Sequence, residues 1–243
     1  MSCELRSLSL DVRDPAALAA FWARVLGRDL GESGTELLPA GPSDVAIRFC
    51  RRDDVRQALG RTHFDLTSAT AAEQDSTVAL ALDLGASHID VGQLPEEGHV
   101  VLADPEGNEF CVIEAVNGFL ADTARIGALS CDGTRAVGLF WSEALAWPLV
   151  WDEGEETAIQ SPAGGTKIAW GGPPVAAKEG LDKLRLDLVV TGDSTLDHEV
   201  ERLVGLGARR LDLELEPGEV LLADPDDNEF SVVAQGSEGD ARG

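Results

Sequence analysis

An internal repeat of about 120 residues constrains this chain more than any other feature of its sequence. The segment VLADPEGNEFCVI at 101–113 recurs as LLADPDDNEFSVV at 221–233. The pair FW at 21–22 recurs at 140–141, with nearly the same shift. Self-similarity at a fixed period over the full length indicates a duplicated structural unit rather than chance local patterning. The sequence therefore predicts two copies of one domain.

The two copies are assigned to residues 1–118 and 119–236, with the junction beginning near Asn117 and Gly118. Each copy has the length of an ordinary small domain. The remaining residues, 237–243, are short, polar and without apolar side chains to bury. We expect this acidic tail to be disordered.

Each copy is predicted to contain two βαβββ units, which places the chain in the α+β class. Alternating apolar and polar residues mark the first strand. Asp14 followed by proline opens a helix, and Thr70 with Glu73 forms a capping box for a second one. The first copy is expected to contain strands at 8–12, 36–38, 45–50, 62–67, 89–91, 99–103 and 109–115, and helices at 14–26 and 70–84.

Charge and cysteine content exclude several classes of function. The chain carries 44 acidic and 19 basic side chains, a formal net charge of −25. Such a chain repels the phosphates of nucleic acid, so no nucleic-acid partner is expected. No apolar run reaches the roughly 18 residues of a membrane span, and the start of the chain does not resemble a secretory signal. The four cysteines lack metal or disulfide spacing, which indicates free thiols and a cytoplasmic location.

The order of elements and the repeated motifs resemble the vicinal oxygen chelate superfamily, specifically its glyoxalase-like and bleomycin-resistance domains. The resemblance rests on the helix containing FWARVLG at 21–27 and on DPEGNEF at 104–110, most of which recurs at 224–230. It covers nearly the whole chain. The resemblance implies two tandem domains, each with two βαβββ modules forming a cup-shaped mixed sheet. It also implies that the tandem domains reproduce, as an intramolecular pseudo-dimer, the interface that single-domain relatives form by dimerising; a homodimer of the whole chain stays open.

Members of the superfamily commonly bind a divalent metal ion in the cup, where it polarises substrate oxygens. The matching positions of the first copy fall on Ser7, His63 and Cys111, which do not form the usual His and Glu ligand set. If a metal ion binds at all, its ligands are expected to be His63, Cys111 and Cys50, since zinc accepts nitrogen and sulfur. These cysteines can equally be small core residues.

The second copy offers still less to a metal ion. Its matching positions fall on Ile126, Arg185 and Ser231, and neither an alkyl group nor a guanidinium can coordinate a cation. We therefore predict no cofactor. Arg185 could instead contact an anionic ligand.

His63, Asp65 and Thr67 alternate along one predicted strand and should share one face. His63 and Asp65 are the candidate catalytic pair, although a hydrogen-bonded structural pair is the alternative. Asp187 repeats Asp65, which favours a structural role because Arg185 replaces the histidine there.

Trp151 and Trp170 belong to the second copy alone, and could form aromatic walls for a ligand or pack in the core. The candidate ligand-binding residues are thus Ser7, Thr67, Cys111, Trp151, Trp170, Arg185, Asp187 and Ser231.

Three hypotheses for function follow. The first is a metal-independent protein that binds a small metabolite or antibiotic, like the drug-sequestering members of the superfamily. The second is an enzyme (a lyase, isomerase or dioxygenase) that uses His63 as ligand or base on a small oxygenated substrate. The third is a degenerate domain pair that serves as a scaffold or regulatory module. Because one fold hosts many functions, the site must decide between them.

Overall fold

A computed structural model describes residues 2–41, 43–53, 60–94, 96–178, 180–213 and 218–236. The tail predicted at 237–243 lies outside these residues. The described helices are α1 (Pro15–Leu26), α2 (Ala71–Asp83), α3 (Arg135–Leu145) and α4 (Leu196–Leu206). None of these four is long and apolar enough to cross a membrane.

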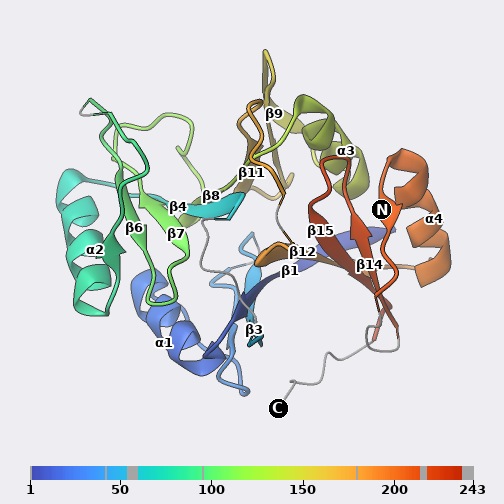
Figure 1. Cartoon of the computed structure of the whole chain (residues 1–243), viewed down its shortest axis with the longest axis horizontal. Helices are drawn as coiled ribbons and strands as arrows, with labels where there is room; N and C mark the ends of the chain where they lie inside the picture. Colours follow the sequence, from blue (N-terminus) through green and yellow to red (C-terminus); the bar gives the residue numbers. More distant parts are fainter. Residues whose placement is uncertain are drawn as a thin grey trace.

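Two mixed sheets form the body of the molecule (Figure 1). The seven-stranded sheet has the order β13-β14-β15-β12-β1-β3-β2. Its strands are β1 (Cys3–Val12), β2 (Glu36–Leu37), β3 (Ala46–Arg51), β12 (Leu184–Val190), β13 (Arg209–Arg210), β14 (Glu219–Ala223) and β15 (Glu229–Val233).

The eight-stranded sheet has the order β5-β6-β7-β4-β8-β11-β10-β9. Its strands are β4 (Thr62–Leu66), β5 (Ser87–His88), β6 (Val100–Ala103), β7 (Glu109–Val112), β8 (Ile126–Cys131), β9 (Leu149–Glu153), β10 (Glu156–Gln160) and β11 (Lys167–Trp170). The strand predicted at 89–91 is wrong by a few residues, because Ser87 and His88 are the residues that pair with β6.

Each sheet combines one βαβββ unit from each repeat. In the seven-stranded sheet β1 pairs antiparallel with β12, so the first unit of the chain joins the last. In the eight-stranded sheet β4 pairs antiparallel with β8, which joins the two middle units. The α+β class and the two tandem copies are confirmed. The two units of one copy do not form a sheet of their own, because each sheet takes one unit from each copy. The structure adds that strands pair between the repeats, as expected for an intramolecular pseudo-dimer.

The residues predicted to begin and end the helices make the contacts expected of capping residues. The Asp14 side chain accepts a hydrogen bond from the Ala17 amide at 3.1 Å, and Gly27 ends α1 in the left-handed conformation with φ 65°. The Thr70 hydroxyl accepts from the Glu73 amide at 3.1 Å. These bonds satisfy amide groups that a helix leaves without partners at its start.

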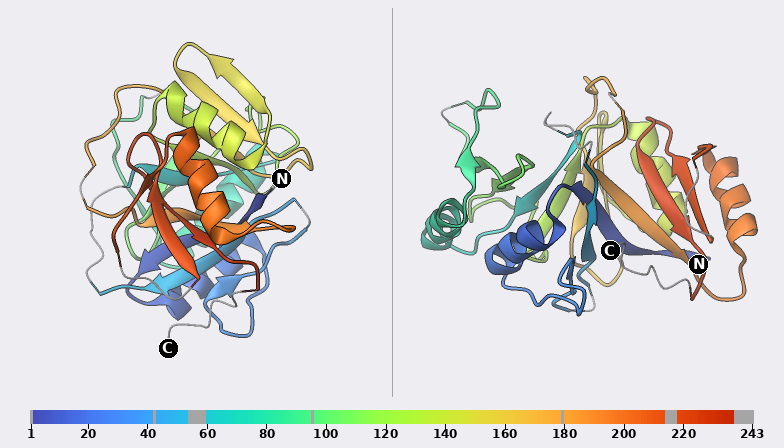
Figure 2. Two further views of the ribbon diagram at one scale, coloured as in Figure 1. Left: turned by 90° about the vertical axis from the view of Figure 1, so that its right-hand side faces the viewer. Right: turned by 60° about the horizontal axis from the view of Figure 1, so that its bottom comes forward.

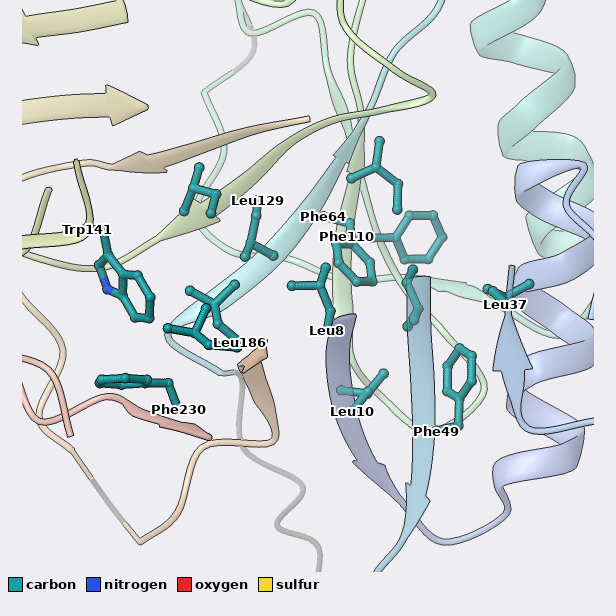
Figure 3. Packing of buried hydrophobic residues seen from close by; sticks show 14 of the residues in the cluster. Leu8, Leu10, Leu37, Phe49, Phe64, Phe110, Leu129, Trp141, Leu186 and Phe230 are labelled. Carbon is teal, nitrogen blue, oxygen red and sulfur yellow. The ribbon is translucent and has the colours of Figure 1, made fainter. Parts of the chain in front are cut away.

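The helices and the core hold each repeat together across the two sheets. Trp22 of α1 lies edge-on against Phe64 and Phe110 of the eight-stranded sheet, with ring centroids 5.4 and 5.0 Å apart. Trp141 of α3 packs in the same way on Phe230 of the seven-stranded sheet, at 4.8 Å. Figure 3 shows Phe64, Phe110, Trp141 and Phe230 among the buried apolar side chains of the core. The opposite side of the eight-stranded sheet carries a second, smaller apolar cluster, which includes Val101, Cys111 and Ala128, next to polar residues such as Asp65.

Candidate functional site

Two cups result from this arrangement, one on each sheet. Cup 1 is the face of the seven-stranded sheet that carries Ser7, Asp187 and Ser231, which are register partners on β1, β12 and β15. Cup 2 is the face of the eight-stranded sheet that carries Asp65 and its register partner Cys111. Figure 2 shows the two sheets from two further directions. Strand alternation points these side chains away from the apolar core.

His63 lies between two carboxylates at the centre of cup 2. Its Nε2 atom is 3.4 Å from Oδ1 of Asp65, and its Nδ1 atom is 3.8 Å from Oε1 of Glu109. The Ser130 hydroxyl donates to Oδ2 of Asp65 at 2.5 Å. The histidine side chain keeps 29% of its surface exposed, so it is accessible from the cup.

The surroundings act in opposite directions on the pKa of His63. Burial lowers this pKa, whereas the hydrogen bond to Asp65 and the negative charges of Asp65, Glu109 and Asp132 raise it, and the net direction is upward. The pKa of the nearby Cys111 thiol is raised by burial and by the charges of Asp65 and Glu109. The imidazole is thus favoured in its charged form, and the thiol in its neutral form.

A cavity of about 470 Å³ opens beside His63 in cup 2. Most of the lining residues lie on strands β8 to β11 or directly after β8 and β11. The others are His63 of β4 and Phe119 of the junction between the repeats. The lining residues are His63, Phe119, Ser130, Cys131, Asp132, Trp151, Glu156, Thr157, Ala169, Trp170 and Gly171. The volume lies within the range of about 300 to 1,000 Å³ that is typical of small-molecule pockets.

The two tryptophans predicted as aromatic walls have different surroundings. Trp151 is 38% exposed and meets Phe119 edge-on at 6.1 Å. Trp170 is only 2% exposed and packs with the main core, while also lining the cavity. Both tryptophans therefore line the cavity, as predicted for aromatic walls, and Trp170 also packs in the core, which was the alternative.

Phe119 is a cavity residue that the sequence did not reveal. It lies in the junction between the repeats, where Lys167 makes two contacts with it. The Lys167 ammonium donates to the Phe119 carbonyl and sits 4.5 Å from the centre of its ring. A junction has no counterpart within either repeat, so repeat comparison gave no signal for it.

Cup 1 is occupied by its own polar side chains. Oδ2 of Asp187 accepts hydrogen bonds from the hydroxyls of Ser7, at 2.8 Å, and Ser9. Oδ1 accepts from the Ser231 hydroxyl at 2.8 Å. All four residues are buried, with at most 5% of their surface exposed. This network closes on itself, as buried polar groups require.

A second cluster in cup 1 pairs arginines with Asp11. Arg185 binds both carboxylate oxygens of Asp11, at 2.7 and 2.8 Å. Arg52 adds a bond to Oδ2 at 2.8 Å. Such two-pronged pairs are strong and geometrically specific. Asp11 and Arg52 were not among the predicted site residues, because their contacts depend on the pairing of distant strands.

Register partners show why one cup is full and the other hollow. Reading across the strands from β4, cup 2 presents His63, Ser130, Ala169 and Ala158. The equivalent row from β12 in cup 1 presents Arg185, Ser9, Arg48 and Glu36. Two long charged side chains of cup 1 are thus replaced by methyl groups in cup 2. Of the two alanines, Ala169 lines the cavity and Ala158 is fully buried, so the smaller side chain at Ala169 contributes to the cavity.

The structure brings only some of the predicted site residues together. His63, Asp65 and Cys111 converge in cup 2, whereas Cys50 belongs to cup 1 near Ser9 and Asp11, so the set His63, Cys111 and Cys50 does not assemble. Ser7, Arg185, Asp187 and Ser231 also lie in cup 1, apart from Trp151 and Trp170.

Two residues depart from their predicted places because of irregular pairing. The register between β4 and β8 shifts after Asp65. The Thr67 hydroxyl then donates to the Ala124 carbonyl at 3.2 Å, in the junction. Ile126 pairs with Leu66 and is a core residue, so the position equivalent to Ser7 is Ala128. The prediction for Ile126 was therefore wrong by two residues.

The residues of cup 2 fit a metal ion only in part. Donor atoms of His63, Asp65 and Cys111 lie within 4.8 Å of one another, and nitrogen, oxygen and sulfur together suit zinc. However, Ser130 and His63 already occupy the two oxygens of Asp65, and burial holds the thiol in its neutral form. An ion would have to replace these partners. The described residues therefore do not form a prepared ligand set.

Comparisons with known proteins support the fold. A family model described as a glyoxalase-like domain matches residues 7–113 and again 127–233. Glyoxalase I from Zea mays has a TM-score of 0.65 at 12% identity, covering 96% of this chain and 92% of that chain. A putative dioxygenase from Bacillus subtilis has a TM-score of 0.60 at 13% identity, covering 96% and 85%. No curated protein sequence matches the chain. At these identities the structural likeness establishes the fold alone.

Proposed function

Because the chain belongs to the family of glyoxalase-like domains, we propose that it is a small-molecule binding protein whose ligand occupies cup 2. One observation carries this proposal: cup 2 has a cavity of about 470 Å³ that is lined by Ala169, whose equivalent in cup 1 is Arg48. A duplicated fold with one cup closed by its own side chains and the other hollow indicates that the hollow cup receives something else.

The lining of cup 2 suits an organic ligand with a flat apolar part. Ala169 contributes a small side chain to the lining, and the rings of Trp151 and Phe119, which also line the cavity, meet edge-on. Aromatic side chains supply large apolar contact area at a small cost in conformational entropy. His63, Ser130 and Asp132 add a few polar groups that can orient the ligand.

Filling the cavity is expected to abolish binding without unfolding the protein. Ala169→Phe adds a ring over the floor of cup 2, so the affinity for the neutral dye Nile red should fall by about tenfold or more. A fluorescence titration measures this affinity, and circular dichroism monitors the fold. Ala46→Phe, which adds the same ring to β3 in cup 1, is the matched control and should leave the dye affinity unchanged. Equal affinities of wild type and Ala169→Phe would remove cup 2 as the site.

The second candidate is an enzyme of the same superfamily, in which His63 acts as a base or as a metal ligand. The observation in its favour is the contact of His63 with Asp65 at the cavity wall, which can hold and orient a proton-accepting imidazole. The partial fit of the donor set leads us to favour binding without a metal ion.

Removing metal ions separates the two candidates. Dialysis against EDTA should leave the Nile red affinity within about twofold of the starting value, because the polar atoms of cup 2 already pair with one another. Elemental mass spectrometry of the purified protein is the companion measurement. Near-stoichiometric zinc that is lost in His63→Ala, together with a changed dye affinity, would favour the enzyme instead.

A further inference from the structure

Cup 1 shows how this fold neutralises a carboxylate at the end of its central strand. Asp11 follows the serines of β1, and its amide donates to the Lys183 carbonyl at 2.8 Å. Its carboxylate is 7% exposed and receives three bonds from the guanidinium groups of Arg185 and Arg52. The pair with Arg185 is two-pronged and nearly dry, a geometry that is specific for planar cations.

Asp132 occupies the equivalent place in cup 2. Its amide donates to the Arg61 carbonyl at 2.7 Å, which is the same bond one repeat later. The residue equivalent to Arg185 is His63, because both pair with the serine two positions before the aspartate. The carboxylate of Asp132 accepts one long bond, 3.3 Å, from the Ala176 amide. Within the described part of the chain, no lysine or arginine nitrogen forms an ion pair with it.

The electrostatics of cup 2 agree with this difference. Asp132 and Glu156 line the cavity, and His63 is the lining residue that can carry a positive charge. Asp65, Glu109 and Asp132 all raise the pKa of that histidine. Cup 2 therefore retains an acid, Asp132, at the place of Asp11, but lacks the arginines that neutralise Asp11 in cup 1.

We propose that the ligand of cup 2 carries a planar cation, an amidinium or guanidinium group, which binds Asp132 as Arg185 binds Asp11 in cup 1. The proposal rests on the function proposed above and names the chemical class of its ligand. The flat body of the ligand lies against Trp151 and Phe119, and the cationic group takes the space that an arginine fills in cup 1. The place of the cationic group follows from the equivalence of Asp132 and Asp11, and the place of the flat body follows from the residues that line the cavity.

Three probes of nearly identical shape test this class: naphthamidine is cationic, naphthamide is neutral and naphthoate is anionic. Isothermal titration should give naphthamidine an affinity about tenfold or more above that of naphthamide, with naphthoate weakest, because hydrogen bonds between charged groups are stronger than those between neutral ones. Asp132→Asn should abolish the preference for the cation, so that naphthamidine and naphthamide bind with similar affinities. Asp83→Asn, which removes one exposed acid at the end of α2, is the matched control and should keep the preference.

His63→Arg gives a second test, because it restores the arrangement of cup 1. The new guanidinium should occupy Asp132 and reduce naphthamidine binding about tenfold or more. Equal binding of naphthamidine and naphthamide to the wild type would overturn the cationic class while leaving cup 2 as a binding site. A preference that survives Asp132→Asn would overturn the role of Asp132. Failure of all three probes, together with failure of Nile red, would overturn the proposed function itself.

Discussion

Asp187→Ala is expected to lower the free energy of unfolding by about 3 kcal/mol or more, because it leaves three buried hydroxyl groups without their acceptor. The hydroxyls of Ser7, Ser9 and Ser231 all donate to Asp187, and each serine is at most 4% exposed. Water cannot readily replace the lost carboxylate in so dry a place. Equilibrium unfolding in urea, at constant pH, measures the loss.

The equivalent change in cup 2 is the control. Asp65 accepts one serine hydroxyl and faces His63, and both partners can reach solvent through the cavity. Asp65→Ala should therefore cost only about 1 kcal/mol. This contrast expresses the view that cup 1 is structural and cup 2 is open. Equal losses for the two aspartates would contradict it.

Asp104→Ala is expected to have an effect of similar size, about 3 kcal/mol, since the carboxylate satisfies several donors in a buried turn. It accepts bonds from the indole nitrogen of Trp22 at 3.1 Å and from the amides of Glu106 and Asn108, each at 2.9 Å. Asp104 is 3% exposed, and Trp22 comes from helix α1. Thermal unfolding of the variant should show a large fall in melting temperature.

The second repeat supplies a replicate of this experiment. Asp224 accepts from the indole nitrogen of Trp141 at 3.1 Å and from the Asp226 and Asn228 amides. Asp224→Ala should therefore match Asp104→Ala to within about 1 kcal/mol. Trp22→Phe, which removes the indole donor but keeps an aromatic ring, should cost less than Asp104→Ala. A stable Asp104→Ala protein would mean that the repeated turn is not held by its aspartate.

The repeated turn explains why this segment dominates the sequence signal. Asp104 and Asp224 each organise their own turn and bind a tryptophan about 80 residues away, so each repeat keeps the same pair of partners. These contacts lie within one copy and involve residue types that have few substitutes. A motif with so many local constraints is visible in sequence, and it correctly predicted the duplicated domain.

The sequence predicted which side chains of the candidate site lie together only for residues that are neighbours along one strand. His63 and Asp65 do share a face and meet Cys111, as alternation indicates. Thr67 leaves that face because the register shifts beyond Asp65, and a shift of this kind depends on the partner strand.

The sequence by itself therefore determined the duplication, the order of the elements and the ends of the helices, because caps, turns and alternation act between residues close in the chain. Only the tertiary structure decided that β1 pairs with β12 and β4 with β8, and hence which side chains share a cup. Backbone hydrogen bonds between strands are much the same for any sequence, so they leave no local trace of the partner. Whether a cup has room for a ligand depends on the side chains that meet across that pairing, such as Arg48 beside Ser9 in cup 1 and Ala169 beside Ser130 in cup 2.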